Sequence, residues 1–452
     1  MKKSVCVIGA GPSGMGIACQ YSQLINSGHI SELDLKIYEK QDISGGLWNL
    51  TWLTGASPNG EPVHGSMYKN LWSNGPKEGL EFPDYTFKEH FGRAIPSFPP
   101  REVLLDYLRG RWKKYSAERF VEYEKIIKNV SYDSQTKKFT VCIYDIQTDE
   151  LFSKEFDYVV NATGHFSSPH LPTFAGIESF PGRILHSHDF RSTEEFKNKT
   201  VLIVGASYSA EDIALQCHKF GVERVVCSYR SKPMAFKWPA NIVERPLLLK
   251  IDGRTCFFKD GSSEDFDAII FATGYIHTYP WMQNELRISC REPNTYFVDN
   301  LYKGILWTKG GGDKLLYMGA QDQLYTFTLF DVQANWVIKY IAGLISLPTK
   351  ENMIQDWMEW KEKLNTKVKS FDDEAWFQLS YMKDLVGESE YPHELNCNDL
   401  FIQWHHSKDK RILAYRDDQY ESIYTKKKSP LHHTPWILAH DSSLSTYLNG
   451  NK

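Results

Sequence analysis

The sequence predicts an α/β protein in which two similar βαβ folds are nested along one chain. Two features that each occur twice carry this prediction. The first is an apolar strand followed by a glycine-rich turn and a helix, at residues 4–25 and again at 200–220, with the helices expected over 15–25 and 211–220. The second is an apolar strand that ends in Ala-Thr-Gly, at residues 158–164 and 268–274. Each glycine-rich turn also precedes a further β-rich run, which completes a doubly wound unit.

The first turn has the spacing of a dinucleotide-binding motif. The strand over residues 4–8 leads into Gly9-x-Gly11-x-x-Gly14, and Glu39 ends the next strand of the unit. Gly9 permits a tight turn, Gly11 lets the backbone approach a pyrophosphate, and Gly14 allows the helix to pack closely on the strand. The helix N-terminus offers N–H groups to the phosphates, and Glu39 would accept hydrogen bonds from ribose hydroxyls.

The second turn departs from this pattern. Gly205 is kept, but Ser207 and Ala210 stand where the second and third glycines would be. Arg230 ends the following strand, where folds that bind NAD carry an acidic residue, and a guanidinium there can pair with a 2′-phosphate. We therefore expect the second nucleotide to be NADP, with a surface arginine that binds no ligand as the alternative.

Two dinucleotide sites in one chain indicate electron transfer between two carriers, of which a tightly held flavin and an exchangeable nicotinamide are the useful pair. The chain has no CxxC, so the dithiol that flavin disulfide reductases need is missing. We expect two nested Rossmann-like dinucleotide-binding domains. The FAD-binding domain is discontinuous, with residues 1–167 and 290–452, and the NADP-binding domain has residues 168–289. Amphipathic helices over 331–345 and 350–367 are expected to cover the first domain.

Composition excludes several classes of protein. The 52 Lys+Arg and 56 Asp+Glu give a net charge of −4, so we expect no nucleic-acid partner. No run of about 20 apolar residues is free of charges or prolines, so no membrane span is expected. The eight cysteines are scattered without spacing suited to zinc, which predicts reduced thiols, no metal site and a soluble, cytoplasmic protein. Lys2-Lys3 and the apolar run after them imitate a secretory signal, but the glycines from Gly9 onward would break it, so secretion is the less favoured alternative.

The segment just before the second turn resembles the FxGxxxHxxx(Y/F) fingerprint of class B flavin-containing monooxygenases. It reads Phe180-Pro181-Gly182-Arg183-Ile184-Leu185-His186-Ser187-His188-Asp189-Phe190. Three further motifs are similar to that family: Gly45-Gly46-Leu47-Trp48 on the flavin side, Ala272-Thr273-Gly274-Tyr275, and the active-site stretch Tyr68-Lys69-Asn70-Leu71-Trp72-Ser73-Asn74. The resemblance covers essentially the whole chain and implies a two-dinucleotide-binding flavoprotein architecture. It is greatest to the soluble members, the bacterial trimethylamine monooxygenases and the insect pyrrolizidine-alkaloid N-oxygenases.

The resemblance implies cofactor contacts at the matching positions. FAD would lie against Gly9, Gly11, Ser13, Gly14, Glu39, Gln41, Leu47, Trp48 and His64, with Gln321 near the flavin ring. NADP would contact Trp72, Ser207, Tyr208, Ser209, Arg230 and Arg416. The implied catalytic residues are Tyr208 and Asn74. Asn74 would lie at the junction of flavin and nicotinamide, where its amide can donate to one group and accept from the other.

The activity that the resemblance implies is NADPH- and O2-dependent monooxygenation. NADPH would reduce FAD, O2 would add to the flavin at C4a, and the hydroperoxide would pass an oxygen atom to a tertiary amine, an alkaloid or a sulfide. The implied partners are thus a small-molecule substrate and O2, and a homodimer is allowed. Two alternatives stay open. One is a Baeyer–Villiger monooxygenase of ketones, whose fingerprint usually ends in Trp-Pro, whereas this one ends in Phe190-Arg191. The other is a nucleotide-sensing flavoprotein whose redox state controls a partner.

Overall fold

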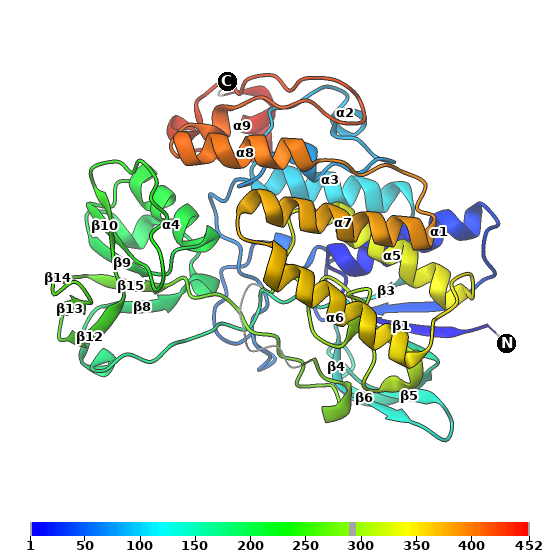
Figure 1. Cartoon of the computed structure of the whole chain (residues 1–452). Coiled ribbons are helices and arrows are strands. Elements are labelled where there is room, and N and C mark those ends of the chain that lie inside the picture. The colour runs from blue at the N-terminus through cyan, green and yellow to red at the C-terminus, as the bar shows by residue number, and fades with distance from the viewer. Residues whose placement is uncertain (1, 289–294, 451–452) are drawn as a thin grey trace.

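The computed structural model describes residues 2–288 and 295–450 and divides them into two lobes (Figure 1). The smaller lobe, green in Figure 1, is built from the middle of the chain, and the larger lobe contains the segments before and after it. The expected domain boundary at residues 289 and 290, together with Cys290, lies outside the described residues. No helix in the described ranges is long and apolar enough to cross a membrane.

The larger lobe is centred on a seven-stranded sheet of described residues with the order β16-β17-β18-β7-β1-β2-β3. Its strands are β1 (Ser4–Ile8), β2 (Asp34–Tyr38), β3 (Val121–Glu122), β7 (Tyr158–Asn161), β16 (Leu301–Tyr302), β17 (Leu306–Trp307) and β18 (Leu315–Tyr317). From β18 to β3 the neighbouring strands run parallel, and β1 pairs with β2 on one side and β7 on the other. The turn after β1 and the turn after β7 therefore open at the same edge of the sheet.

Strand β1 shows why this sheet needs cover on both faces. Val5 and Val7 pack against the helices on one face, while Cys6 and Ile8 pack against the other, beside an antiparallel sheet. That antiparallel sheet consists of β4 (Lys125–Asp133), β5 (Lys138–Asp145) and β6 (Glu150–Phe156). Side chains alternate along a strand, so a strand buried on both faces reads as a continuous apolar run.

Helices cover the first face of the seven-stranded sheet and extend away from it (Figure 1). They are α1 (Pro12–Asn26), α2 (Phe87–Phe91), α3 (Arg101–Lys114), α5 (Thr326–Ala342), α6 (Lys350–Lys367), α7 (Phe371–Ser389), α8 (Asn398–Lys410) and α9 (Leu444–Asn449). Helix α6 has the bounds expected from the sequence. Helix α5 begins five residues before the expected 331 because Phe327 and Leu329, in its first turn, are buried.

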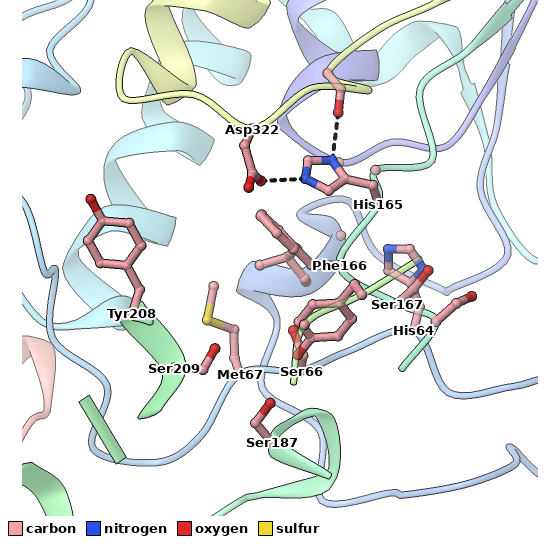
Figure 2. Close-up of a pocket in the computed structure, with 18 of the residues that line it drawn as sticks. His64, Ser66, Met67, His165, Phe166, Ser167, Ser187, Tyr208, Ser209 and Asp322 are labelled. Carbon is pink, nitrogen blue, oxygen red and sulfur yellow. Dashed lines mark hydrogen bonds and ion pairs between the residues drawn. The ribbon is translucent and has the colours of Figure 1, made fainter. Parts of the chain in front are cut away.

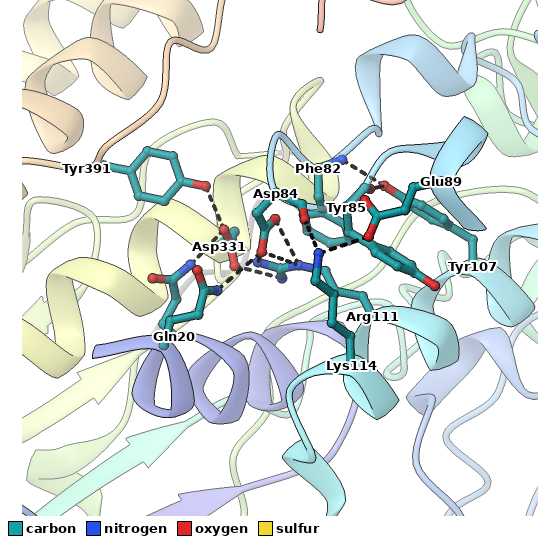
Figure 3. A network of polar contacts seen from close by, with 11 residues as sticks. Gln20, Phe82, Asp84, Tyr85, Glu89, Tyr107, Arg111, Lys114, Asp331 and Tyr391 are labelled. Atoms are coloured by element: carbon teal, nitrogen blue, oxygen red, sulfur yellow. Dashed lines mark hydrogen bonds and ion pairs between the residues drawn. The ribbon is translucent and has the colours of Figure 1, made fainter. Parts of the chain in front are cut away.

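A buried polar network fixes α1 against its neighbours (Figure 3). The Arg111 guanidinium donates to Asp331 at 2.8 Å and to Asp84 at 2.9 Å. Asp331 also accepts from the Gln20 amide of α1 at 2.8 Å and from the Tyr391 hydroxyl at 2.6 Å. Removing one partner from such a buried ion pair typically costs about 3–5 kcal/mol. The network therefore holds the helix that follows the first glycine-rich turn.

The smaller lobe contains a parallel sheet with the order β11-β10-β9-β15-β8. Its strands are β8 (Arg183–His186), β9 (Thr200–Val204), β10 (Arg224–Ser228), β11 (Ile242–Arg245) and β15 (Ala268–Phe271), beside the antiparallel β12 (Leu248–Asp252), β13 (Thr255–Phe258) and β14 (Ser263–Asp265). Helix α4 (Tyr208–Lys219) begins three residues earlier than expected. The early start makes Ser207 its N-cap residue.

The strands of the two sheets fall within the domains expected from the sequence, but one segment crosses over. Tyr279, Met282 and Leu286 pack in the core beside β4 and β5 of the larger lobe. The Val130 amide donates to the Trp281 carbonyl at 2.7 Å across this junction. The chain thus returns to the larger lobe before residue 289, and this packing favours a boundary closer to Gly274.

Candidate functional site

A cavity of about 980 Å³ lies where the two lobes meet. Its walls include Gly9 and Glu39 from the larger lobe and Ser207 and Arg230 from the smaller one. Both parallel sheets thus turn the ends of their strands toward it, which is where open α/β sheets bind ligands. The volume is at the upper end of the range for small-molecule sites.

Gly14 and Gly11 of the first turn are glycines for two different physical reasons. A Cβ on Gly14 would lie 1.9 Å from the carbonyl oxygen of Gly9, so α1 can approach the turn only with glycine there. A Cβ on Gly11 would meet nothing nearer than the Cα of Gly46, at 3.6 Å. Gly11 is therefore not needed for packing of the protein itself. The space beside it belongs to the cavity, as a pyrophosphate-binding turn requires.

Glu39 is held in place by two backbone amides. Its carboxylate accepts from Ala10 N at 2.7 Å and from Gln41 N at 2.9 Å. Burial raises the pKa of Glu39, while these amides oppose the shift. A carboxylate has about four lone-pair sites, so acceptor capacity remains for ribose hydroxyls in the cavity. The arrangement fits the adenosine end of a dinucleotide.

The other predicted FAD contacts that line the cavity are Ser13, Gln41, Leu47, Trp48 and His64. Burial lowers the pKa of His64 to about 3, with Lys40 and His188 adding to the shift, so the imidazole is neutral. The loop that carries it is fixed by the buried Arg191 guanidinium, which donates to the carbonyls of Leu53 at 2.7 Å and Gly65 at 2.8 Å. These residues fit a large, mostly uncharged ring system.

Helix α4 presents its N-terminus to the cavity. Ser207, Tyr208 and Ser209 all line it, and the Ser207 side chain does not cap the helix. Uncapped N–H groups and the positive end of the helix dipole favour phosphate groups. Arg230 is exposed on the same wall, and no hydrogen bond or ion pair to another described residue occupies its guanidinium. This wall fits a phosphorylated dinucleotide such as NADP.

The predicted active-site stretch also reaches the cavity. Trp72 is buried and donates its indole N–H to Ser442 at 2.8 Å, while Asn74 is exposed in the cavity wall. The backbone between them is pinned because the Ser73 amide donates to Pro99 at 2.8 Å and the Ser73 carbonyl accepts from Arg416 at 3.1 Å. The Asn74 side chain is thus free for a ligand on a fixed backbone.

Three predicted contacts do not line this cavity: Gly14, which packs against the Gly9 carbonyl, Arg416 and Gln321. Arg416 is buried, and its guanidinium donates to Ser73 and forms an ion pair with Asp212. Gln321 is buried with its amide 3.5 Å from that of Gln333, behind the wall that its neighbour Asp322 forms. Arg416 thus contacts two residues of the wall, whereas Gln321 contacts Gln333 behind it, and direct contacts to a cofactor stay a prediction for all three.

The sequence reasoning missed a histidine–aspartate pair at the cavity (Figure 2). His165 Nδ1 lies 2.9 Å from the Gly319 carbonyl oxygen, and its Nε2 lies 3.0 Å from Asp322 Oδ1. Each ring nitrogen of His165 therefore lies within hydrogen-bond distance of an oxygen atom. The signal was available, because His165 directly follows the first Ala-Thr-Gly motif and Asp322 directly follows Gln321. Figure 2 shows Tyr208 and Ser209 across the cavity from this pair.

The fingerprint before the second turn has a packing role in the structure. Phe180 and Phe190 lie in the cores on opposite faces of the smaller sheet. A Cβ on Gly182 would lie 2.3 Å from the Asp267 carbonyl oxygen, and burial lowers the pKa of His186 to about 4. The residue after it, Ser187, reaches the cavity. The fingerprint thus joins the edge strand β8 to the cavity wall.

No group of three or more His, Cys, Asp or Glu side chains suited to a metal ion occurs within residues 2–288 and 295–450.

Comparisons with known proteins consistently indicate one family. The family model described as flavin-binding monooxygenase-like matches residues 2–237 and 239–391. The trimethylamine monooxygenase of Methylocella silvestris is 47% identical over 450 residues, covering 98% of each chain.

Two solved structures extend this answer to the fold. The crystal structure of Tmm from Pelagibacter sp. strain HTCC7211 has a TM-score of 0.95 at 42% identity, and the match covers 98% of this chain and 100% of that one. S-allyl-L-cysteine S-oxygenase from Allium sativum has a TM-score of 0.80 at 27% identity, with 92% and 95% covered. The expected Rossmann-like α/β fold is thereby confirmed. The chain belongs to the flavin-binding monooxygenase-like family and is a flavin-containing monooxygenase whose cofactors are FAD and NADP.

Proposed function

We propose that this enzyme uses NADPH and O2 to N-oxygenate small tertiary amines. The observation that carries the proposal is that one cavity receives both the Gly9–Gly14 turn and the N-terminus of α4. Two dinucleotides bound at these turns would meet inside a single cavity. The 47% identity to an enzyme named trimethylamine monooxygenase supports the choice of a small amine.

The chain's own residues bind and orient the cofactors in this proposal. The first turn and Glu39 hold FAD, and the N-terminus of α4 with Arg230 holds NADP. When bound, FAD supplies the activation of O2, and NADPH supplies the hydride. Asn74 bridges the two through its amide, which donates on one side and accepts on the other.

Aromatic side chains line the far part of the cavity. Phe330, Tyr296, Phe401 and Trp404 contribute to its wall, together with Tyr208. Burial raises the pKa of Tyr208, and the nearby carboxylates of Glu374, Glu211 and Asp322 add to the shift, so its hydroxyl stays protonated. Exclusion of water protects a reactive oxygen donor until the substrate arrives.

S-oxygenation of sulfides is a second candidate, because a relative at 27% identity is named an S-oxygenase. Sulfides and amines are both soft nucleophiles, so one oxygen donor can serve both.

Alkaloid substrates, the homodimer and a cytoplasmic location stay predictions. The Baeyer–Villiger alternative is less favoured. In those enzymes the fingerprint usually ends in Trp-Pro, whereas here it ends in Phe190-Arg191, and the Arg191 guanidinium donates hydrogen bonds to backbone carbonyls.

The experiment is an oxygenation assay with the purified holoenzyme and NADPH. Addition of trimethylamine should accelerate NADPH oxidation and O2 uptake, with one N-oxide formed per NADPH. Dimethyl sulfide and cyclohexanone serve as the competing substrates. Oxygenation of cyclohexanone but not of trimethylamine would overturn the proposal in favour of ketone chemistry. NADPH oxidation that no substrate alters, with hydrogen peroxide as the product, would favour a sensor.

A further inference from the structure

One end of the cavity combines carboxyl groups with aromatic rings. Asp322 reaches it from the loop after β18, Glu374 from the first turn of α7, and Tyr208 from α4, while Tyr296 and Trp404 complete the wall. Burial raises the pKa of Tyr296, and Glu374, Tyr208 and Asp322 add to the shift, which shows how close these groups lie. Five separate segments of chain therefore build one acidic, aromatic end.

Glu374 is the less committed of the two carboxyl groups. It is partly buried, its nearest amide partner, Gln378 Nε2, is 3.5 Å away, and Tyr296 contributes a side-chain hydrogen bond. Asp322 instead is paired with His165, whose Nε2 lies 3.0 Å from Asp322 Oδ1. Among the described residues, Glu374 is thus the carboxyl group of this end that forms no ion pair.

An amine substrate makes such a group necessary. Aliphatic amines, like the lysine side chain, are mostly protonated in water at neutral pH. An ammonium nitrogen has no lone pair, so it cannot accept an oxygen atom. An enzyme that takes amines from water must bind the cation and then remove its proton in a site that solvent does not reach freely.

We infer that Glu374 takes the proton of the bound ammonium substrate, after Asp322 and the ring of Tyr296 have held the cation. The inference rests on the proposed N-oxygenase function. In this step the N–H bond breaks, an O–H bond forms on the Glu374 carboxylate, and the electron pair stays on nitrogen. The overall reaction balances as ammonium, NADPH and O2 giving N-oxide, NADP⁺ and water, so the released proton ends in the water.

The surroundings of Glu374 suit this task. Burial raises its pKa to about 7; the hydrogen bond from Tyr296 and the charge of Lys408 oppose the shift, and Asp322 adds to it. A carboxyl group that titrates near the working pH is well matched to proton transfer. Cations bind to the faces of Trp and Tyr rings. Lys408 Nζ already lies 4.7 Å from the centroid of the Tyr208 ring and 5.2 Å from that of the Trp404 ring, which leaves Tyr296 as the ring of this end with no such cation among the described residues.

The test compares Glu374→Gln with wild type on two substrates, trimethylamine and dimethyl sulfide. The glutamine keeps the size and the hydrogen-bonding capacity but cannot accept the proton. Asp372→Asn is the matched control, because it removes the same charge from the same helical turn, where Asp372 is 43% exposed and paired with His406. We expect kcat/KM for trimethylamine at pH 7 to fall about tenfold or more in Glu374→Gln. The value for dimethyl sulfide, which has no proton to lose, should change less than about twofold.

The pH profile separates proton transfer from a structural role. In wild type, amine oxygenation should rise with pH and level off above about 7, where Glu374 is ionised. In Glu374→Gln it should keep rising about tenfold per pH unit, because only the free amine in solution reacts. Tetramethylammonium, which cannot lose a proton, should inhibit wild type competitively and inhibit the variant less.

The outcomes distinguish this inference from the function on which it rests. Equal losses on the amine and the sulfide, or parallel pH profiles for wild type and Glu374→Gln, would overturn the role of Glu374 while N-oxygenation stands. A wild-type enzyme that forms no N-oxide at any pH would overturn the proposed function itself. If dimethyl sulfide is not a substrate, the pH profile and the inhibition by tetramethylammonium decide.

Discussion

The two glycine-rich turns begin in the same way and are completed by different means. Gly9 and Gly205 both have positive φ, +101° and +140°. A Cβ on Gly9 would lie 3.0 Å from the Ala162 carbonyl oxygen, and one on Gly205 would lie 2.2 Å from that of Ala272. These alanines belong to the two Ala-Thr-Gly motifs. The two repeats seen in the sequence are thus one structural unit, formed twice, in which the glycine turn packs on the neighbouring strand's end.

After that common start the turns differ. Helix α1 is buried and has no acidic residue in its first turn. Near the start of α4, Glu211 and Asp212 would repel a phosphate, but Lys408 lies 2.8 Å from Glu211 and Arg416 pairs with Asp212. Backbone atoms form the wall of the first turn, whereas side chains from the C-terminal segment neutralise the carboxylates beside the second turn. This difference suits a cofactor that stays bound and one that exchanges.

The third glycine position should show the largest effect. Gly14→Val places a side chain where a Cβ alone would lie 1.9 Å from a backbone carbonyl, so we expect insoluble or unfolded protein. Ala210→Gly, at the matching place in the second turn, should cost only about 1 kcal/mol as a glycine near a helix start. Soluble yield and thermal unfolding measure the effect of each substitution. A stable Gly14→Val protein would contradict the close packing of α1.

The second glycine position should affect the cofactor rather than the fold. Gly11 has φ of −75° and free space beside it, so Gly11→Val is expected to fold but to be purified without FAD. Flavin absorbance per protein and the circular dichroism spectrum measure the two properties separately. The matched change in the second turn, Ser207→Val, should weaken NADPH and leave FAD bound. Stoichiometric FAD in Gly11→Val would mean that the flavin lies elsewhere.

The ion pair between Lys408 and Glu211 tests the role of the C-terminal segment. Both side chains are about 95% buried or more, so Lys408→Ala leaves a buried, unpaired carboxylate beside the cavity wall that Ser207, Tyr208 and Arg230 form. We expect a loss of about 3–5 kcal/mol in stability and a higher KM for NADPH. The double variant Lys408→Met with Glu211→Gln should recover most of both. No recovery would show that Lys408 acts through packing on Tyr208 and Trp404 instead.

Arg230 should decide which nicotinamide is used. Loss of a charge-assisted pair costs about 1.5–3 kcal/mol, so Arg230→Ala should lower kcat/KM for NADPH about ten- to a hundredfold and leave that for NADH nearly unchanged. Arg183→Ala is the control, because that arginine is exposed on β8 and does not line the cavity. Equal weakening of both cofactors would mean that Arg230 supports the structure and does not read the 2′-phosphate.

Replacing Asn74 should have the smallest effect on the rate of NADPH oxidation but a clear effect on which product is formed. Asn74→Ala removes an amide from the cavity wall on a backbone that Ser73 holds fixed. We expect NADPH oxidation to continue while hydrogen peroxide replaces N-oxide, because oxygen transfer depends on polar groups that hydride transfer does not need. Asn70→Ala, in the same loop but outside the lining, is the control. Unchanged N-oxide per NADPH would mean that Asn74 is only a loop residue.

Local patterns were enough to predict the strands that lead into the two glycine-rich turns. The strand expected at 4–8 has the observed bounds, and β9 begins at residue 200, where the second repeat was expected to begin, because an apolar run bounded by glycine or a charged residue specifies a buried parallel strand on its own. The helix starts were less accurate. Helix α1 begins at Pro12 and α4 at Tyr208, each three residues earlier than expected. Proline is favoured in the first helical turn, a signal that was present in the sequence for α1.

By itself, the sequence determined the two nucleotide turns, their order and the family, because each turn is a short motif whose residues are neighbours along the chain. Only the tertiary structure decided which side chains share the cavity. Gln321 and Arg416 match the family pattern but lie behind the wall, since the direction of a side chain depends on what packs around it. His165 meets Asp322, and Tyr296 meets Glu374, across long stretches of chain. Local motifs mark His165 and Asp322 one at a time, but no local pattern specifies that two such residues meet, because the pairs exist only once the chain segments of the larger lobe have packed together.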